Sequence, residues 1–260
     1  MDLNLKGKRA IVCGSTRGIG KAIAIELALL GAAVTLVARD EDALARVCEE
    51  LPKAQAQRHE YLVADFNFPE QLRSVIDGYS QTMVHILVNN TGGPAAGKAI
   101  DANLEDFVKA FAAHLLCNQV LVQSLVPRMK EAGYGRIINV ISTSVKIPIP
   151  GLGVSNTIRG AVANWAKTLS AELAPFGITV NNVLPGATLT DRLEQVLALK
   201  AGKSGKSVDE LREQMISEIP SRRIAAPHEV AAAAAFLATP AAAYINGINL
   251  PVDGGRTGSL

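Results

Sequence analysis

Three glycines between residues 14 and 20 mark the first stretch whose residue types and spacing suggest chemistry. The stretch reads Gly-Ser-Thr-Arg-Gly-Ile-Gly and joins an apolar run at 9–13 to a segment with helical apolar spacing at 18–30. Glycines let a backbone turn tightly and approach a pyrophosphate, whose charge faces the N-terminus of the following helix. The spacing is G-x-x-x-G-x-G, not the usual G-x-G-x-x-G. Its place between a strand and a helix favours nucleotide binding over a purely steric turn. The residues expected at the phosphates are Gly14, Ser15, Thr16, Arg17, Gly18, Ile19 and Gly20.

The end of the second apolar run, Val-Ala-Arg-Asp at 37–40, bears on the type of nucleotide. Folds that bind NAD often place an acidic residue there for the ribose 2′-hydroxyl, whereas arginine accommodates the 2′-phosphate of NADP. Ala38 has no carboxylate, Arg39 follows it, and Arg17 offers a second guanidinium. We therefore predict NADP(H). NAD(H) is not excluded, because Asp40 would meet the ribose if the strand ended one residue later, and Arg39 would serve equally as a solvated surface charge.

These residues need a scaffold that gathers them at one edge of a sheet. Strand-like runs at 9–13, 33–38, 60–64, 86–89, 136–141, 179–184 and 247–252 alternate with helical patterns, the longest at 104–130 with room for a break. The alternation predicts a single domain over residues 1–260, an α/β fold with a Rossmann-like, doubly wound parallel sheet and helices on both faces. Ligands of such sheets bind beyond the carboxyl ends of the strands.

Residues 190–220 interrupt this alternation. They contain the small and basic run Lys-Ala-Gly-Lys-Ser-Gly-Lys-Ser, followed by a helix-like segment at 208–219. The stretch follows the sixth predicted strand, at the edge where ligands bind. We expect a substrate lid at 187–220; the alternative is a solvated surface insertion.

Composition narrows the classes of function. The chain has 260 residues, 48% of them hydrophobic, with a net charge of +2, which indicates neither nucleic acid nor a membrane surface as a partner. Its three cysteines, at 13, 48 and 117, have the spacing of neither a disulfide framework nor a zinc site, and the histidines suggest no metal. The N-terminus has no signal-like apolar core, and no uncharged apolar run approaches the ~20 residues of a membrane span. We expect a cytoplasmic protein.

Taken together, five motifs resemble those of the short-chain dehydrogenase/reductase family, especially its 3-oxoacyl-acyl-carrier-protein reductase subgroup. The glycine loop resembles the family's T-G-x-x-x-G-x-G, with Cys13 for threonine, and residues 89–92 resemble N-N-A-G, with Thr91 for alanine. Pro185-Gly186 with Thr190 resembles P-G-x-x-x-T, and residues 252–255 resemble V-D-G-G. Asp65 matches the aspartate that contacts adenine in the family. The resemblance implies further cofactor contacts from Asp65, Phe66, Asn90, Thr91, Gly92, Arg159, Pro185, Gly186, Thr188 and Thr190.

The resemblance also locates the catalytic positions, and three of the four differ from the family. The family uses a serine that holds the carbonyl, a tyrosine that donates the proton, a lysine on the nicotinamide ribose and an asparagine in a proton path. Ser142 matches the serine, but Ser155, Arg159 and His114 occupy the tyrosine, lysine and asparagine positions. No tyrosine lies between Tyr134 and Tyr244, so no shift of register restores the motif.

These replacements keep binding chemistry and remove the usual acid. A serine hydroxyl is a poor terminal proton donor, and an arginine stays charged while it binds ribose hydroxyls or stabilises a developing alkoxide. Histidine titrates near neutral pH, so His114 is a candidate donor, directly or through water and Ser155. The alternative is a structural histidine that fills the space of the missing tyrosine. Asn139, Arg192 and Arg223 are interpreted as structural or surface residues.

Three functions stay open. The first is an NADP(H)-dependent oxidoreductase for a small carbonyl or alcohol substrate, with an atypical proton donor. The second is a catalytically impaired dinucleotide-binding sensor or scaffold, and the third is another reaction on the same platform, such as elimination or isomerisation. Members of the family commonly form tetramers, and the apolar faces at 107–126 and 154–173 are compatible with a homotetramer.

Overall fold

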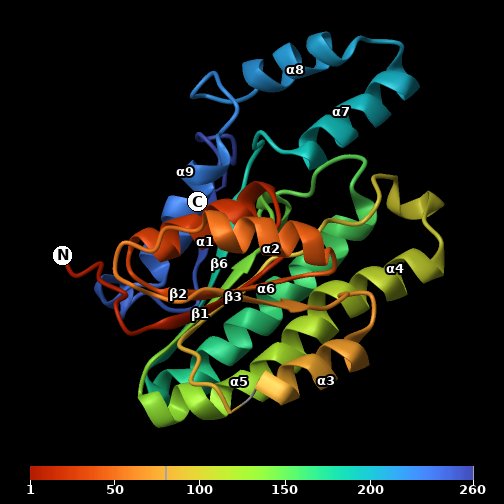
Figure 1. The fold of residues 1–260 in the computed structure, drawn as a ribbon. Helices are drawn as coiled ribbons and strands as arrows, with labels where there is room; N and C mark the ends of the chain where they lie inside the picture. The colour runs from red at the N-terminus through yellow and green to blue at the C-terminus, as the bar shows by residue number, and fades with distance from the viewer. Residues whose placement is uncertain (80, 260) are drawn as a thin grey trace.

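One parallel sheet organises the chain. The computed structural model describes residues 1–79 and 81–259, apart from the side chain of Lys203. Within this part, seven strands lie in the order β3-β2-β1-β4-β5-β6-β7 (Figure 1). The order reverses between β1 and β4, where open α/β sheets leave a crevice at the carboxyl ends of their strands. The strands are β1 (Arg9–Cys13), β2 (Ala33–Ala38), β3 (Glu60–Val63), β4 (Ile86–Asn89), β5 (Gly135–Val140), β6 (Ile178–Pro185) and β7 (Asn249–Val252).

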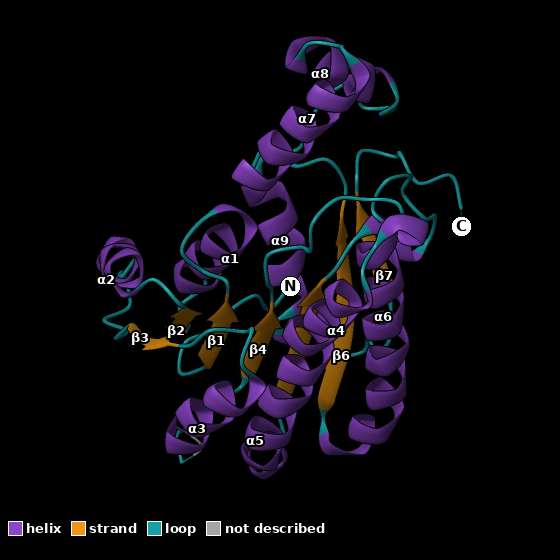
Figure 2. Cartoon of the chain, turned by 90° about the vertical axis from the view of Figure 1, so that its right-hand side faces the viewer, coloured by secondary structure: helices purple, strands orange, loops and turns teal. Residues whose placement is uncertain are grey.

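Helices cover both faces of the sheet, as Figure 2 shows. Successive strand residues point to opposite faces, so Val12 joins one hydrophobic core and its neighbour Ile11 joins the other. The first core lies under α1 (Gly18–Leu29), α2 (Glu41–Glu50) and α9 (Pro227–Leu237). The second lies under α3 (Pro69–Tyr79), α5 (Cys117–Ala132) and α6 (Gly153–Leu173). The predicted Rossmann-like α/β class is confirmed.

The predicted strand ends agree with the observed ones to within two residues. Those at 9–13, 33–38 and 86–89 are unchanged. The largest difference is the last strand, which begins at Asn249 instead of residue 247. Gly247 has a left-handed φ of 72°, a conformation that interrupts extended pairing at that point.

A ladder of buried asparagines fixes the register of four strands just below the carboxyl edge. Asn89 donates to Asn139 at 2.8 Å, Asn139 to Asn182 at 2.9 Å, and Asn182 to Asn249 at 2.8 Å. These residues are also paired across the sheet backbone, so side-chain and main-chain register agree. Buried amides are costly unless hydrogen-bonded, and a one-residue slip would break the ladder. Asn139 is thus structural, as expected.

The long predicted helix contains a break. It consists of α4 (Leu104–Phe111), a π-helical turn at Ala112–Leu116 and α5. By length and composition the run Leu104–Ala132 is the one helix in the described residues that could cross a membrane, but half of its apolar window is buried within the fold. The break inserts an extra residue into the helical turn at His114, a common feature of functional sites.

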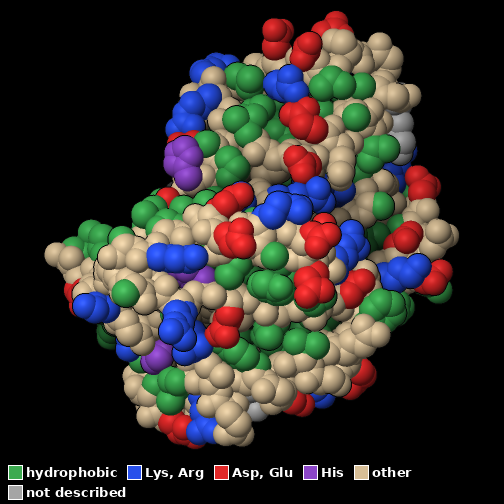
Figure 3. All heavy atoms as spheres, viewed as in Figure 1, with side chains coloured by type: hydrophobic (Ala, Val, Ile, Leu, Met, Phe, Trp, Pro, Cys, Tyr) green, Lys and Arg blue, Asp and Glu red, His purple; other side chains and the backbone are tan. Residues whose placement is uncertain are grey.

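The segment after β6 stands out from the body of the molecule. It contains α7 (Asp191–Ser204) and α8 (Val208–Ser217), which extend beyond the carboxyl edge of the sheet (Figures 1 and 2). Arg212 of α8 joins Glu194 of α7 at 2.7 Å. Figure 3 shows Lys and Arg side chains gathered at the waist between this extension and the body. Its position suits the predicted lid at 187–220, whose movement stays a prediction.

Candidate active site

The glycine loop has no room for side chains at two of its positions. A Cβ at Gly14 would lie 2.5 Å from the Asn90 carbonyl oxygen, and one at Gly20 would lie 2.2 Å from the Gly14 carbonyl oxygen. The Asn90 side chain holds the loop by donating to the carbonyls of Cys13 and Gly14, each at 3.2 Å. No side chain caps the N-terminus of α1, which leaves its first N–H groups available to an anion. This cradle fits the phosphates of a dinucleotide.

Two arginines lie at the carboxyl edge near the end of β2. The strand ends at Ala38, and Asp40 caps α2 by accepting from the Ala43 amide at 3.0 Å. The later strand end that would bring Asp40 to a ribose is therefore not observed. Arg39 is exposed, and Arg17 pairs with Asp191 of α7 at 3.0 Å, with both side chains largely exposed. This ion pair connects the glycine loop to the lid.

The remaining predicted cofactor residues line the same edge. Asp65 and Phe66 follow β3, where the Asp65 carboxylate accepts from the Asn67 amide at 2.9 Å. Thr190 caps α7 and lies against the glycine loop, since a Cβ at Gly18 would be 3.3 Å from its methyl carbon. The Thr188 hydroxyl donates to the Gly186 carbonyl at 3.2 Å. The loops after β1, β3, β4 and β6 thus converge as the motifs predicted.

Ser142 and Ser155 approach the edge from β5 and α6. The Ser142 hydroxyl lies just beyond β5 and accepts from the Ser144 amide at 3.1 Å, which orients it. Ser155 lies half-buried in the first turn of α6, and within the described residues its hydroxyl has no hydrogen-bond partner. It is therefore free to bind a ligand or a water.

Arg159 is a buried cation. Its side chain is on α6, the residue is 7% exposed, and Nη1 donates to the Val140 carbonyl at 3.2 Å while Nε has no partner. Burial, and then the nearby charge of Arg192, lower the pKa of Arg159 to about 10. The guanidinium stays protonated at neutral pH, and its Nε is buried without an acceptor.

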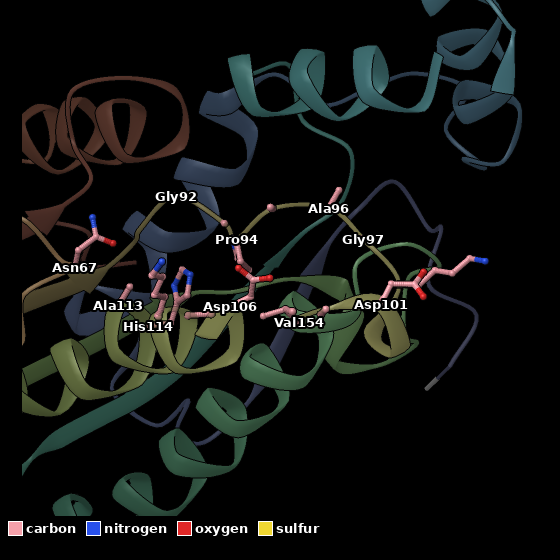
Figure 4. A pocket seen from close by; sticks show the side chains of 16 residues that line it. Asn67, Gly92, Pro94, Ala96, Gly97, Asp101, Asp106, Ala113, His114 and Val154 are labelled. Atoms are coloured by element: carbon pink, nitrogen blue, oxygen red, sulfur yellow. The ribbon is translucent and has the colours of Figure 1, made fainter. Parts of the chain in front are cut away.

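His114 is buried and neutral. The π-helical turn places it where its Nδ1 lies 2.5 Å from the Thr91 hydroxyl, and the residue is only 2% exposed. Burial, and then the charge of Arg159, lower the pKa of His114 to about 2. Its side chain points toward the loop after β4, at one end of a cavity of about 370 Å³ (Figure 4). A neutral imidazole stores no proton for release, so this geometry is compatible with a relay role and with the structural role that the sequence left open.

Arg192, interpreted from the sequence as a structural or surface residue, lies beside the loop after β4. It is half-buried in the first turn of α7, and its Nη2 donates to the Pro94 carbonyl. A Cβ at Gly93 would be 3.7 Å from this guanidinium. The sequence signal that could have indicated this place is its position two residues after Thr190, because the P-G-x-x-x-T segment continues directly into α7. Arg223, by contrast, pairs with Glu229 at 2.6 Å on the surface, as expected.

Comparison with known proteins identifies the family. A family model described as enoyl-(acyl carrier protein) reductase matches residues 14–257. The chain belongs to the short-chain dehydrogenase/reductase family. Among the described residues of this member, no group of three or more His, Cys, Asp or Glu side chains is placed to hold a metal ion.

Several relatives span the whole domain. The chain is 34% identical to an uncharacterized oxidoreductase of Mycobacterium tuberculosis, over 97% of this chain and 93% of that one. It is 30% identical to the NADPH-dependent reductase BacG of Bacillus subtilis, over 97% and 99%. It also resembles the structure of L-sorbose reductase from Gluconobacter frateurii with NADPH and L-sorbose, at 30% identity, a TM-score of 0.92 and 100% coverage of both chains.

Proposed function

We propose that this protein is an NADP(H)-dependent oxidoreductase that interconverts a carbonyl and a hydroxyl group by hydride transfer, with an atypical proton path. The observation that carries the proposal is the glycine cradle at the uncapped N-terminus of α1, which lies at the same edge of the sheet as Ser142 and the buried Arg159. The relatives support it, since one is named an NADPH-dependent reductase and another binds NADPH with its sugar substrate.

The cofactor assignment follows from charge and position. Arg17 and Arg39 are the basic side chains offered to a 2′-phosphate, with the Arg17–Asp191 pair opening on binding. We assign Asp65 and Phe66 to the adenine and the positive charge of Arg159 to the nicotinamide ribose, as the family resemblance implies. When bound, NADP(H) supplies or accepts the hydride. The residues proposed to contact the nicotinamide end of the cofactor are Asn90, Thr91, Gly92, Pro185, Gly186, Thr188 and Thr190.

The protein's own part is to hold the carbonyl oxygen and to bring it a proton. The Ser142 hydroxyl donates to that oxygen, and Arg159 supplies a fixed positive charge that stabilises the oxygen as negative charge develops. The proton comes from bulk solvent through a bound water that Ser155 orients, since a serine hydroxyl is a poor terminal donor. That water gives its proton to the oxygen and regains one from solvent through the Thr91–His114 pair, so no hydroxide stays in the site.

Assembly and location belong to the same proposal. The protein is cytoplasmic and forms a homotetramer, an arrangement supported by exposed apolar side chains on α4, namely Leu104, Val108 and Phe111. Residues 187–220 form the substrate lid. The 3-oxoacyl-acyl-carrier-protein reductase subgroup gives the first substrates to test.

A second candidate function is a dinucleotide-binding sensor or scaffold without turnover. It is favoured by Ser155 in place of a phenol and by the neutral state of His114. Titration with NADPH and NADH, followed by fluorescence, tests cofactor binding; tighter binding of NADH overturns the NADP(H) assignment. A panel of carbonyl substrates, followed by NADPH absorbance, separates the two functions. Tight NADPH binding with no turnover across the panel favours the sensor.

Two variants then test the proton path in an active protein. Ser142→Ala removes the carbonyl donor and is expected to reduce kcat by about two orders of magnitude. His114→Ala removes the relay and is expected to reduce kcat more than it changes KM. Unchanged turnover of His114→Ala at every pH leaves His114 with a structural role only.

A further inference from the structure

Two arginines lie at the carboxyl edge of the sheet and come from different elements. Arg159 of α6 donates to the Val140 carbonyl at the end of β5, and Arg192, in the first turn of α7, donates to the Pro94 carbonyl in the loop after β4. The charge of Arg192 also contributes to the lowered pKa of Arg159. Like charges repel, so their placement at one partly desolvated edge has an electrostatic cost.

No carboxylate of the protein balances these charges. Other lid and edge arginines, Arg17, Arg212 and Arg223, each pair with an Asp or Glu within 3.0 Å. Across the described residues, neither Arg159 nor Arg192 has such a partner. Asp191, the acidic residue next to Arg192, pairs with Arg17 instead.

Backbone carbonyls satisfy only part of the two guanidinium groups. Arg192 donates to Pro94, and Arg159 donates to Val140 and keeps a buried Nε with no acceptor. A buried charge is stable when it is paired and hydrogen-bonded, and here the hydrogen bonds are partial and the ion pair is missing. Asp101 and Asp106 line the cavity beside Gly93 and Pro94, but neither forms an ion pair with these arginines. Within the described part of the chain, Arg192 is therefore a cation without a counterion next to this cavity, where an anionic ligand would supply one.

We propose that the substrate carries a carboxylate held by Arg192, next to the carbonyl that faces Ser142 and Arg159: an oxo acid in one direction, the matching hydroxy acid in the other. The planar guanidinium suits a carboxylate because two parallel N–H donors meet its two oxygens. This inference rests on the oxidoreductase function proposed above and adds its substrate class. Arg192 is then the residue that determines specificity.

The position of Arg192 favours a substrate over the cofactor pyrophosphate. The pyrophosphate has its own cradle, in which the glycine loop is held by Asn90 and adjoins Thr190. Arg192 instead contacts Gly93 and Pro94, farther along the loop after β4. It is also carried by the lid, so closure over a substrate would bring it to the carboxylate.

Matched acids and esters test this inference. The probes are 2-oxo and 3-oxo acids of three to eight carbons and their neutral methyl esters, added to the protein without cofactor and again at saturating NADPH. Thermal unfolding reports binding, and NADPH absorbance reports turnover. The acids are expected to raise Tm and to react, whereas the esters do neither or do so far more weakly.

Variants of the lid then assign the effect to Arg192. Arg192→Gln is expected to remove the Tm shift and to raise KM for the acid about tenfold to a hundredfold, the value of a lost charged hydrogen-bonded pair. Arg192→Lys is expected to retain part of the Tm shift produced by the acid. Arg212→Gln is the matched control, because Arg212 pairs with Glu194 and Asp209 elsewhere on the lid.

The outcomes separate this inference from the proposed function. Equal Tm shifts with acids and esters, or none with any acid, overturn the carboxylate assignment even if NADPH binds and a neutral carbonyl is reduced. A rise of tenfold or more in the NADPH Kd of Arg192→Gln, with acid selectivity unchanged, assigns Arg192 to the cofactor pyrophosphate and also overturns it. A Tm shift by acids without NADPH binding upholds the anion site while the oxidoreductase function fails.

Discussion

The buried His114 predicts a specific loss of stability in mild acid. Replacing it by asparagine, His114→Asn, removes the imidazole while keeping a hydrogen-bonding side chain beside Thr91. In the folded protein the pKa of His114 is lowered from 6.5 to about 2, by burial and then by the charge of Arg159. The His114 imidazole therefore binds a proton near pH 6.5 in the unfolded chain but stays unprotonated in the folded chain. Acidification consequently favours unfolding.

The size of this effect follows from the same pKa difference. One pKa unit corresponds to about 1.36 kcal/mol. At pH 5 the pH lies about 1.5 units below the ordinary histidine pKa of 6.5, so the imidazole of the unfolded chain is protonated. The folded imidazole is still neutral there, so the free energy of unfolding is expected to fall by about 2 kcal/mol between pH 7 and pH 5 through this residue alone. The loss continues toward the folded pKa as the pH falls further.

Urea denaturation at pH 7 and pH 5 measures the effect as a difference between two proteins. The wild-type protein should lose about 2 kcal/mol more than His114→Asn over that interval. His85, whose pKa burial lowers to about 4, contributes equally to both proteins and cancels. A cavity left by the substitution lowers stability at both pH values and leaves the difference untouched. Equal losses in the two proteins would refute the assignment of His114 as a buried neutral group.

Three further predictions concern the cofactor edge. Arg39→Ala should raise the NADPH Kd about tenfold, because it removes a hydrogen bond to a charged group, and should leave the NADH Kd within about twofold. Equal weakening of the binding of both cofactors would argue against a 2′-phosphate contact. Asp191→Asn frees Arg17 from its exposed ion pair and should tighten NADPH up to about fivefold in the same titration, because such pairs contribute at most about 1 kcal/mol. Gly20→Ala places a methyl 2.2 Å from the Gly14 carbonyl oxygen, so it should abolish nucleotide binding and lower the free energy of unfolding by about 1–3 kcal/mol. Its control is Gly202→Ala, which meets open space in α7 and should be neutral or stabilising by urea denaturation; equal effects of the two glycine variants contradict the cradle.

The sequence predicted the sheet well because its central strands, such as β1, β4 and β5, are buried on both faces. Val12 and Ile11 are fully buried on opposite sides of β1, which a continuous apolar run anticipates. The asparagine ladder could not be anticipated, since Asn139 reads as one polar residue in an apolar strand. Only the register of neighbouring strands shows that it meets Asn89 and Asn182.

The candidate site was predictable where motifs are local and not where contacts cross the cleft. The glycine loop and the loops after β3, β4 and β6 lie where spacing placed them. The burial of His114 was not predictable, because it depends on a π-helical turn within a long helix. The position of Arg192 was missed for a similar reason: its contact with Pro94 joins residues 98 positions apart and exists only because α7 starts beside the loop after β4.

Ser155, Arg159 and His114 occupy three of the catalytic positions that the family resemblance assigns, and on that assignment the three replacements are consistent with one another in their charges. Serine at 155 removes both the bulk and the acidity of a phenol, and the cleft gains a hydroxyl with no partner among the described residues. Arginine at 159 keeps the positive charge but is unsuited to exchanging a proton, and its charge helps to hold His114 neutral. A neutral His114 in turn adds no further positive charge beside Arg159 and Arg192. Asp101 and Asp106 line the cavity but pair with neither arginine, so the proposed function assigns the balance of these two charges to an anionic ligand and the supply of protons to water.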